Sequence, residues 1–190
     1  MARTRLTPER ESELYTAVLD LLREVGYDAL TMDAVAARTR SSKATLYRQW
    51  GSKPQLVVRA LRHDKPVALA GTDTGSLRGD FHAALDLVDT CQMEKDSALM
   101  RGLAHAAHGN PDLLQAMREL LIDPEMTGLE TMLRRAVDRG EVRADHPALK
   151  YVPHMLIGAY TTRWLVEDRA VDRAYVIDYV DSVILPALGV

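Results

Sequence analysis

Apolar residues recur at intervals of three and four along most of this chain, from Leu14 to Ile184. This spacing is typical of helices that bury one face, whereas no stretch alternates apolar and polar residues as a half-buried strand would. Residues suited to capping helices precede several of these stretches, and Gly26 and Gly140 follow two of them. The pattern predicts an all-α protein of about nine helices.

The beginning of the chain predicts a head of short helices. Thr7 and Pro8 open a helix whose apolar positions continue to Gly26. Thr31 is suited to capping a short second helix, and Ser42 to capping an equally short third one. The second and third helices are separated by a tight turn, so the three together have the layout of a helix-turn-helix, and a fourth helix follows.

The helical pattern changes between residues 64 and 79, where one proline and three glycines interrupt it. We therefore expect a joint between a head over residues 1–63 and a larger helical body over residues 64–190. Within the body, helix starts are expected at Asp123-Pro124 and at Asp145.

Charge is distributed unevenly along the chain. The net charge is −3, but residues 1–64 hold eleven Lys and Arg against eight Asp and Glu, a balance of +3 that leaves −6 for the remainder. A surface for a polyanion is therefore expected in the head. The third helix is polar at its start and carries Thr45, Tyr47 and Arg48, which favours double-stranded DNA as the partner.

Other classes of function have less support. The motifs of serine hydrolases, zinc proteases and phosphate-binding loops are missing, so we expect neither an enzyme nor a cofactor. His105 and His108 leave a metal-sensing regulator open, and the acidic body leaves open a helical adaptor that has lost DNA binding. The chain has one cysteine, no secretory signal and no apolar run of membrane-spanning length, so a cytoplasmic protein without a membrane partner is expected.

One set of residues in the head matches the pattern of a known family in both residue type and spacing. The N-terminal third resembles the tetracycline-repressor (TetR) family of bacterial transcriptional regulators. The residues that carry this resemblance are Gly26, Thr31, Val35-Ala36, Ser42, Thr45-Leu46-Tyr47 and Ser52-Lys53. The resemblance implies that residues 1–63 form a helix-turn-helix DNA-binding domain and that residues 64–190 bind an effector and form a dimer.

The helix-turn-helix layout and the resemblance together define the candidate DNA-binding residues. Thr31 and Tyr47 resemble phosphate contacts of the family, and Lys53 resembles a further backbone anchor. Thr45 and Arg48 have the donors and acceptors that suit base edges. The full set is Thr31, Ser42, Lys43, Thr45, Tyr47, Arg48 and Lys53.

The turn between the two helices departs from the family pattern. The family often has Ala-Gly-Val, whereas this chain has Thr39-Arg40-Ser41. An arginine in a left-handed turn position costs about 1 kcal/mol relative to glycine. Arg40 is therefore a candidate for an additional phosphate contact.

The resemblance also implies a way of working. Such a regulator represses transcription by binding a palindromic operator as a dimer and is released when a small-molecule effector binds the body. The dimer is expected to form through the last two helices, whose apolar residues include Leu156, Ile157, Leu165, Val180 and Ile184. The candidate effector-binding residues are Met100, Met126, Met132, Tyr151, His154, Met155 and Trp164. The protein is expected in the bacterial cytoplasm, on the nucleoid when bound.

Overall fold

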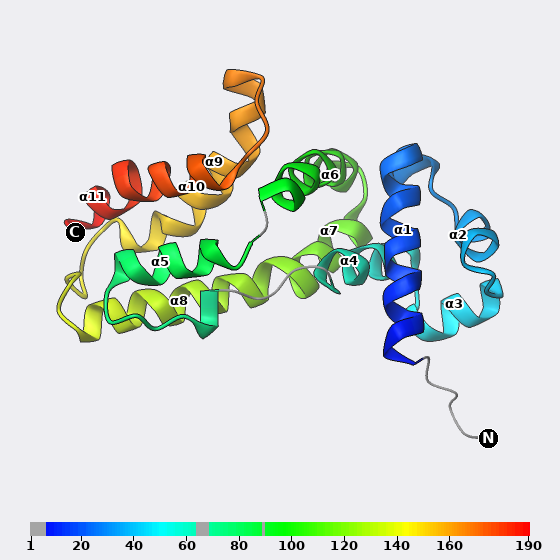
Figure 1. Cartoon of the computed structure of the whole chain (residues 1–190), viewed down its shortest axis with the longest axis horizontal. Helices are drawn as coiled ribbons and strands as arrows, with labels where there is room; N and C mark the ends of the chain where they lie inside the picture. Colours follow the sequence, from blue (N-terminus) through cyan, green and yellow to red (C-terminus); the bar gives the residue numbers. More distant parts are fainter. Residues whose placement is uncertain (1–6, 64–68, 89) are drawn as a thin grey trace. The chain divides into compact units, whose positions relative to one another are not determined.

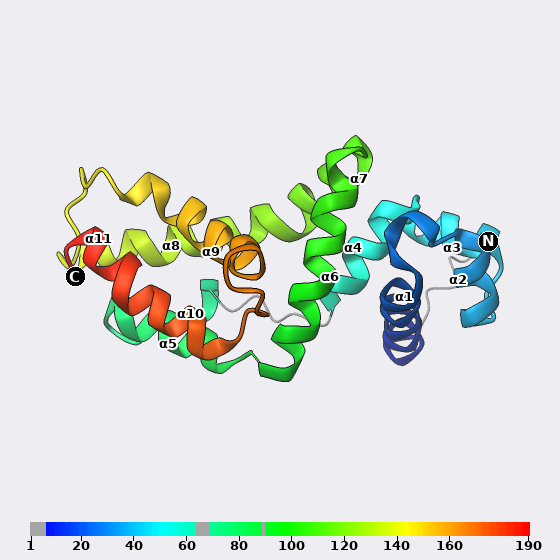
Figure 2. The same ribbon diagram turned by 90° about the horizontal axis from the view of Figure 1, so that it is seen from above.

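The computed structural model describes residues 7–63, 69–88 and 90–190, which are helices and their connections (Figures 1 and 2). No strand occurs among these described residues. Two helical runs, 111–138 and 173–188, are continuous although each contains a π-helical segment. With each run counted once, the described chain has nine α-helices, which confirms the all-α prediction.

The described residues divide into two compact units, and the first is drawn from Met1–Lys65 and Gly102–Leu121. Its helices are α1 (Pro8–Ala29), α2 (Met32–Thr39), α3 (Lys43–Trp50), α4 (Lys53–His63), the end of α6 (Thr90–His108) and α7 (Pro111–Met117). α1 packs against α2 and α4, α3 packs against α2 and α4, and α4 packs against α7. The division of function expected at residue 63 stays a prediction, and residues 64–68, where the joint was expected to begin, lie outside the described residues.

Both ends of α1 follow from residues noted in the sequence. The Thr7 hydroxyl oxygen accepts a hydrogen bond from the Arg10 backbone N–H at 3.3 Å, and Pro8 occupies the first turn. Gly26 has a φ of 76°, which interrupts the regular helix before a last turn to Ala29. A side chain at this left-handed position is strained, so the glycine permits the bend.

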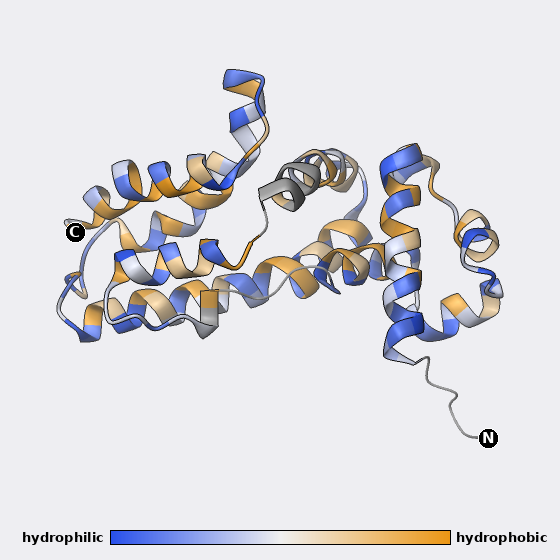
Figure 3. Cartoon of the chain, in the orientation of Figure 1, coloured by the Kyte–Doolittle hydropathy of each residue, from blue (hydrophilic) through white to orange (hydrophobic). Residues whose placement is uncertain are grey.

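The second unit is drawn from Pro66–Arg101 and Ile122–Val190. Its elements are η1 (Leu69–Gly71), α5 (Leu77–Asp86), the start of α6, α8 (Asp123–Asp138), η3 (Leu149–Tyr151), α9 (Val152–Glu167), α10 (Arg173–Tyr179), the π-helical η4 (Val180–Ile184) and α11 (Leu185–Leu188). α5 packs against α8, α10 and η4, while α9 packs against α10. Along α8, hydrophobic and hydrophilic residues alternate at helical spacing (Figure 3).

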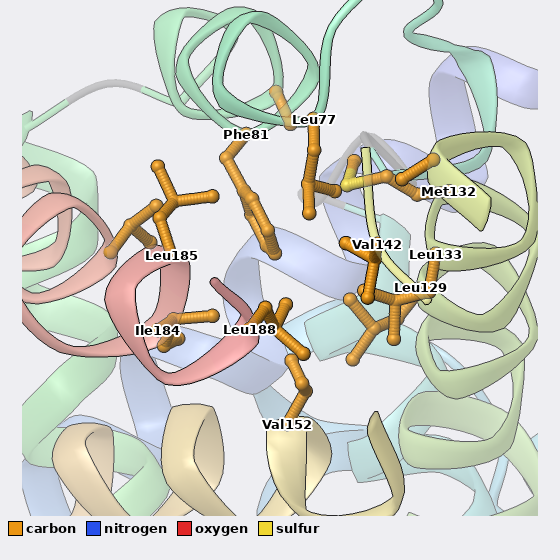
Figure 4. Close-up of a cluster of buried hydrophobic side chains, with 13 residues drawn as sticks. Leu77, Phe81, Leu129, Met132, Leu133, Val142, Val152, Ile184, Leu185 and Leu188 are labelled. Carbon is orange, nitrogen blue, oxygen red and sulfur yellow. The ribbon is translucent and has the colours of Figure 1, made fainter. Parts of the chain in front are cut away.

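The core of the second unit is a cluster of apolar side chains from α5, α8, α9 and the final helical run. Phe81 points into this cluster between Leu77 and Leu185 (Figure 4). Burying a leucine or phenylalanine side chain contributes roughly 1.5–3 kcal/mol, so this cluster is the main source of stability in the unit. Val180 and Ile184 belong to it with no exposed surface, which corrects their assignment to the dimer surface.

A buried carboxylate lies beside this core. The Asp80 side chain has no exposed surface and accepts hydrogen bonds from the Thr74 backbone N–H at 2.6 Å and the Thr74 hydroxyl at 2.9 Å. Its other oxygen accepts one from the Arg139 guanidinium at 3.2 Å. Burial alone would raise the pKa of Asp80, but these donors hold it below its ordinary value.

Two expected helix starts differ from the structure: α8 begins at Asp123 but without the expected cap, and the helix expected at Asp145 begins later. Pro124 lies inside the continuous run 111–138, where the chain passes it through the π-helical segment η2 (Arg118–Ile122). Proline has no N–H for the Leu120 carbonyl four residues earlier, and this oxygen instead accepts a hydrogen bond from Arg62 at 3.1 Å. Asp145 pairs with Arg143 at 2.8 Å in a turn, and the helix expected there begins at Val152.

None of the helices in the described ranges combines the length and apolar character needed to cross a membrane.

Candidate DNA-binding surface

α2, the turn and α3 form the helix-turn-helix that the sequence predicts. The Thr31 hydroxyl oxygen accepts a hydrogen bond from the Ala34 N–H at 3.1 Å, and the Ser42 hydroxyl oxygen accepts one from the Thr45 N–H at 3.0 Å. Both caps therefore leave the remaining N–H groups of a helix N-terminus directed outward. These groups and the hydroxyl hydrogens are suitable donors to phosphate oxygens.

α3 is fixed by its apolar face and exposes its polar one. Leu46 and Trp50 are buried, and they dock the helix on the rest of the unit. Tyr47 is 44% exposed and Arg48 is also exposed. Thr45 is half-buried, with its hydroxyl 2.8 Å from that of Ser42. The side chains suited to DNA thus occupy the face of α3 that is turned away from the core.

Trp50 is held by a chain of hydrogen bonds that begins in the core and ends at the half-buried Glu11. Its Nε1–H donates to the Tyr15 hydroxyl at 2.9 Å, and that hydroxyl donates to the Glu11 carboxylate at 2.8 Å. The Trp50 and Tyr15 rings meet edge to face with centroids 6.0 Å apart. Burial raises the pKa of Tyr15 to about 12, so this phenol stays protonated and keeps its role as a donor. The orientation of α3 relative to α1 is fixed by these contacts.

Two ion pairs connect the helices around the turn. Lys43 donates from Nζ to Asp33 at 2.9 Å, which joins the first turns of α3 and α2. Arg38 forms a two-point pair with Glu24, with N–O distances of 3.1 and 2.6 Å, which joins α2 to α1. Within the part of the chain that the structure describes, the guanidinium groups of Arg40 and Arg48 form no ion pair.

The turn has the left-handed residue that its sequence predicts. Arg40 follows α2 with φ 50° and ψ 39°, and its N–H donates to the Ala36 and Ala37 carbonyls. Figure 3 shows the turn between α2 and α3 as hydrophilic. The neighbouring Thr39 carbonyl accepts a hydrogen bond from Arg10 at 2.5 Å. A side chain with a strained backbone is thus presented at the surface beside the recognition helix.

Lys53 occupies a less exposed position than a free phosphate anchor would. Its Nζ donates to the Tyr27 and Leu30 carbonyls, each at 2.9 Å, and lies 4.2 Å from the centre of the Tyr27 ring. Burial lowers the pKa of Lys53. An ammonium group has three donors, so one N–H remains after these two bonds. Lys53 therefore stabilises the chain just before Thr31.

The structure brings most of the candidate DNA-binding residues into one region. The members from Thr31 to Arg48 lie on α2, α3 and their caps, and Lys53 begins α4. The sequence analysis missed the contacts of Arg10 and Asp33 with this region. Arg10 and Thr39 are 29 residues apart, and no local pattern indicates such a contact.

The chain matches two family models. Residues 14–60 match the model described as bacterial regulatory proteins, tetR family, and residues 72–183 match the tetracyclin repressor-like C-terminal domain. The chain belongs to the TetR family. This TetR-family protein is therefore a helix-turn-helix transcriptional regulator, as its sequence predicts.

Individual relatives agree with this assignment. The regulator is 34% identical to an uncharacterized HTH-type transcriptional regulator of Mycobacterium tuberculosis, over 94% of this chain and 88% of that protein. It is 33% identical to the DNA-binding transcriptional repressor TetR of Mycobacteroides abscessus, over 93% and 92%. The crystal structure of the TetR family transcription regulator SCO0332 has a TM-score of 0.69 and 31% identity, covering 94% of this chain and 98% of that one.

The candidate effector-binding residues of this TetR-family regulator fall into separate surroundings. Met132 is fully buried in the core, and Met126 and Met155 pack against that core from its edge. Tyr151 is half exposed, and its ring lies 6.2 Å from that of His154. Met100 is half-buried, and Trp164 lies under the Arg101 guanidinium at 5.0 Å. Among the described residues, no group of three histidine, cysteine or acidic side chains is placed to hold a metal ion.

Proposed function

We propose that this regulator is a repressor that binds a palindromic DNA operator as a dimer and is released by a small-molecule effector. The observation that carries the proposal is the construction of α3. Leu46 and Trp50 fix one face of this helix in the core, and Thr45, Tyr47 and Arg48 stand on the other. A rigid helix with a polar outer face is what reading of the major groove requires.

Each candidate residue has a chemical role in this proposal. Thr31, Ser42 and Tyr47 donate from their hydroxyls to phosphates, and Lys53 adds its remaining N–H. Thr45 contacts a base edge or a thymine methyl group, and Arg48 donates two hydrogen bonds to guanine. Arg40, without a carboxylate partner among the described residues, adds a contact to phosphate.

The dimer is proposed to form through α9 and the final helical run. α9 is apolar around most of its circumference, yet Val152 and Arg163 are its buried residues. Ile157 is 43% exposed and Leu165 69%, and both lie on one side of α9 because they are eight residues apart. Val183, at 39%, extends the apolar surface to the last run. Exposed apolar side chains on neighbouring helices are suited to a partner with the same surface.

The effector is proposed to bind in the second unit, at the edge of the core near Met126 and Met155. Methionine side chains are unbranched and flexible, so they adapt to a ligand at little cost. Met132 would line such a cavity only after core side chains move, because it is fully buried. Effector and DNA binding would then oppose each other through one coupling free energy. We further propose that the protein acts in the cytoplasm, where the DNA is, and not as an enzyme.

The test is a selection of bound duplexes from a random library, followed by titration of the selected duplex at several salt concentrations. A palindromic site that is bound tightly by one or more dimers is the expected result. Weak binding that is equal for all sequences would contradict the proposal. The selected duplex also supplies the assay in which compounds are screened for release of the regulator.

Replacing Lys53 with alanine should weaken binding to every duplex and reduce the salt dependence of log K by about one unit, because one phosphate contact is lost. The Lys53→Arg variant keeps the charge and should keep the salt dependence. Titration of both variants across salt concentrations measures this. An unchanged salt slope with a lower free energy of unfolding would mean that Lys53 acts only by binding the Tyr27 and Leu30 carbonyls.

Replacing Arg40 with glycine should change stability and DNA binding in opposite directions. The left-handed conformation costs a side chain up to about 1 kcal/mol, so the free energy of unfolding should rise by that amount. Operator affinity should fall and the salt slope should decrease by about one unit, because a phosphate contact is lost. Arg40→Asn, which tolerates this conformation without a charge, should lose the same affinity. If both variants bound the operator with wild-type affinity, Arg40 would not be a DNA contact.

A further inference from the structure

Asp33 is an acidic residue within the surface that is proposed to bind a polyanion. It lies in the first turn of α2, two residues after Thr31, and its side chain is 73% exposed. A carboxylate at this position does not favour general attraction to phosphate. Among the described residues, its one hydrogen-bond and ion-pair partner is Lys43, the first residue of the recognition helix, at 2.9 Å.

The pair adds little to folding, because both side chains are largely in water and Lys43 is 48% exposed. Its geometry has a clearer consequence for the ammonium group. The hydrogen bond and the charge of Asp33 raise the pKa of Lys43, in agreement with the contact between the two groups. One of its three N–H donors is used by Asp33, and two remain.

An unrestrained lysine follows whichever phosphate is nearest, because it is a point charge on a flexible chain. A lysine held on Asp33 is restricted to the space between the first turns of α2 and α3. In helix-turn-helix proteins the N-terminal residues of the recognition helix contact base edges. Two free donors in that place match the O6 and N7 acceptors of guanine.

We propose that Asp33 is a specificity-determining residue, which holds Lys43 toward the base edges and away from the phosphates of other sequences. The inference rests on the proposed function, since it requires α3 to enter the major groove. On an arbitrary duplex, Lys43 held by Asp33 gives up a phosphate contact. On the operator, the same restraint places the two free N–H donors of Lys43 within reach of acceptors on the base edges.

The test compares wild type with Asp33→Asn on the selected operator and on a scrambled duplex of equal length, at several salt concentrations. Asparagine keeps the size and a side-chain oxygen but removes the charge that holds Lys43. Affinity for the scrambled duplex should rise about tenfold, with a salt slope steeper by about one unit, because Lys43 gains a phosphate. Affinity for the operator should change by less than about threefold, so the ratio of the two affinities falls.

Two control variants separate this effect from a general change of charge. Asp20 is a comparable acid on α1, 51% exposed and paired with Arg23 at 3.0 Å, and Asp20→Asn should leave the ratio unchanged. In a Lys43→Ala background, Asp33→Asn should no longer lower the ratio. Circular dichroism checks that each variant is folded.

Several outcomes would overturn the inference. An unchanged ratio in Asp33→Asn, or an equal fall in Asp20→Asn, would show that Asp33 has no special role. An equal fall in the Lys43→Ala background would show that Asp33 acts by direct repulsion and not through Lys43. A wild-type protein that does not distinguish the two duplexes would instead overturn the proposed function, and this inference with it.

Discussion

Replacing Trp50 with alanine should lower the free energy of unfolding of the first unit by about 3–5 kcal/mol and abolish operator binding, because a large side chain leaves a cavity that the core cannot close. Trp50 is 2% exposed, and with Leu46 it is what anchors α3. An unanchored recognition helix no longer presents Thr45 and Arg48 in a fixed geometry. Urea unfolding followed by circular dichroism, together with operator titration, measures both effects.

The matched control is Trp50→Phe, which keeps an aromatic ring but removes the Nε1–H that donates to Tyr15. The free energy of unfolding should fall by about 1 kcal/mol because this hydrogen bond is lost, and part of the operator affinity should be retained. The Tyr15 hydroxyl still donates to Glu11 in this variant, so no buried donor is left without an acceptor. If Trp50→Ala bound the operator as wild type does, α3 would be held in place by other contacts.

The sequence predicted the helix-turn-helix well because its signals are local. Thr31 and Ser42 cap helices through hydrogen bonds to residues three positions later, and such bonds depend on the neighbouring chain alone. The left-handed Arg40 likewise follows from the need to turn between two helices. Residues that make only short-range contacts can therefore be assigned before the structure is known.

Contacts between distant residues were not predictable in this way. Lys53 was assigned as a phosphate anchor, which stays a prediction, and its two hydrogen bonds to carbonyls 23 and 26 residues earlier were not foreseen. Val180 and Ile184 have the same apolar pattern as an interface helix, and only the packing of η4 on α5 shows that they belong to the core. Hydrophobic spacing identifies the buried face of a helix but not what covers that face.

Pro124 illustrates the same limit at a helix boundary. A proline after an aspartate usually marks a first turn, and the sequence favoured a new helix there. The π-helical segment η2 lets the run continue, and the freed Leu120 carbonyl accepts its hydrogen bond from Arg62, on α4. A carbonyl whose hydrogen-bond donor comes from another helix cannot be recognised from the local sequence.

Replacing Asp80 with alanine should lower the free energy of unfolding of the second unit by about 3 kcal/mol, because two Thr74 donors lose their buried acceptor and Arg139 loses one of its carboxylate partners. We expect the lower end of the usual range since the Arg139 side chain is 24% exposed and can recover part of its hydration. Asp80→Asn keeps an acceptor for Thr74, so its free energy of unfolding should fall by less. Urea unfolding of both variants at neutral pH measures their free energies of unfolding. The comparison separates the contribution of the charge from that of the hydrogen bonds.

The pH dependence of this difference tests its electrostatic origin. The folded-state pKa of Asp80 is held below its ordinary value of 3.8 by the Thr74 and Arg139 donors, despite the opposing effect of burial. A carboxylate with a lowered pKa stabilises the folded state fully above the unfolded-state value, and this contribution is lost as the pH falls through the folded-state value. The difference in free energy of unfolding between wild type and Asp80→Asn should therefore be constant from pH 7 to about pH 5 and shrink below about pH 4. A difference that stays constant down to pH 2.5 would mean that Asp80 stabilises the unit by packing and neutral hydrogen bonds, and that Arg139 contributes through its pair with Glu141 instead.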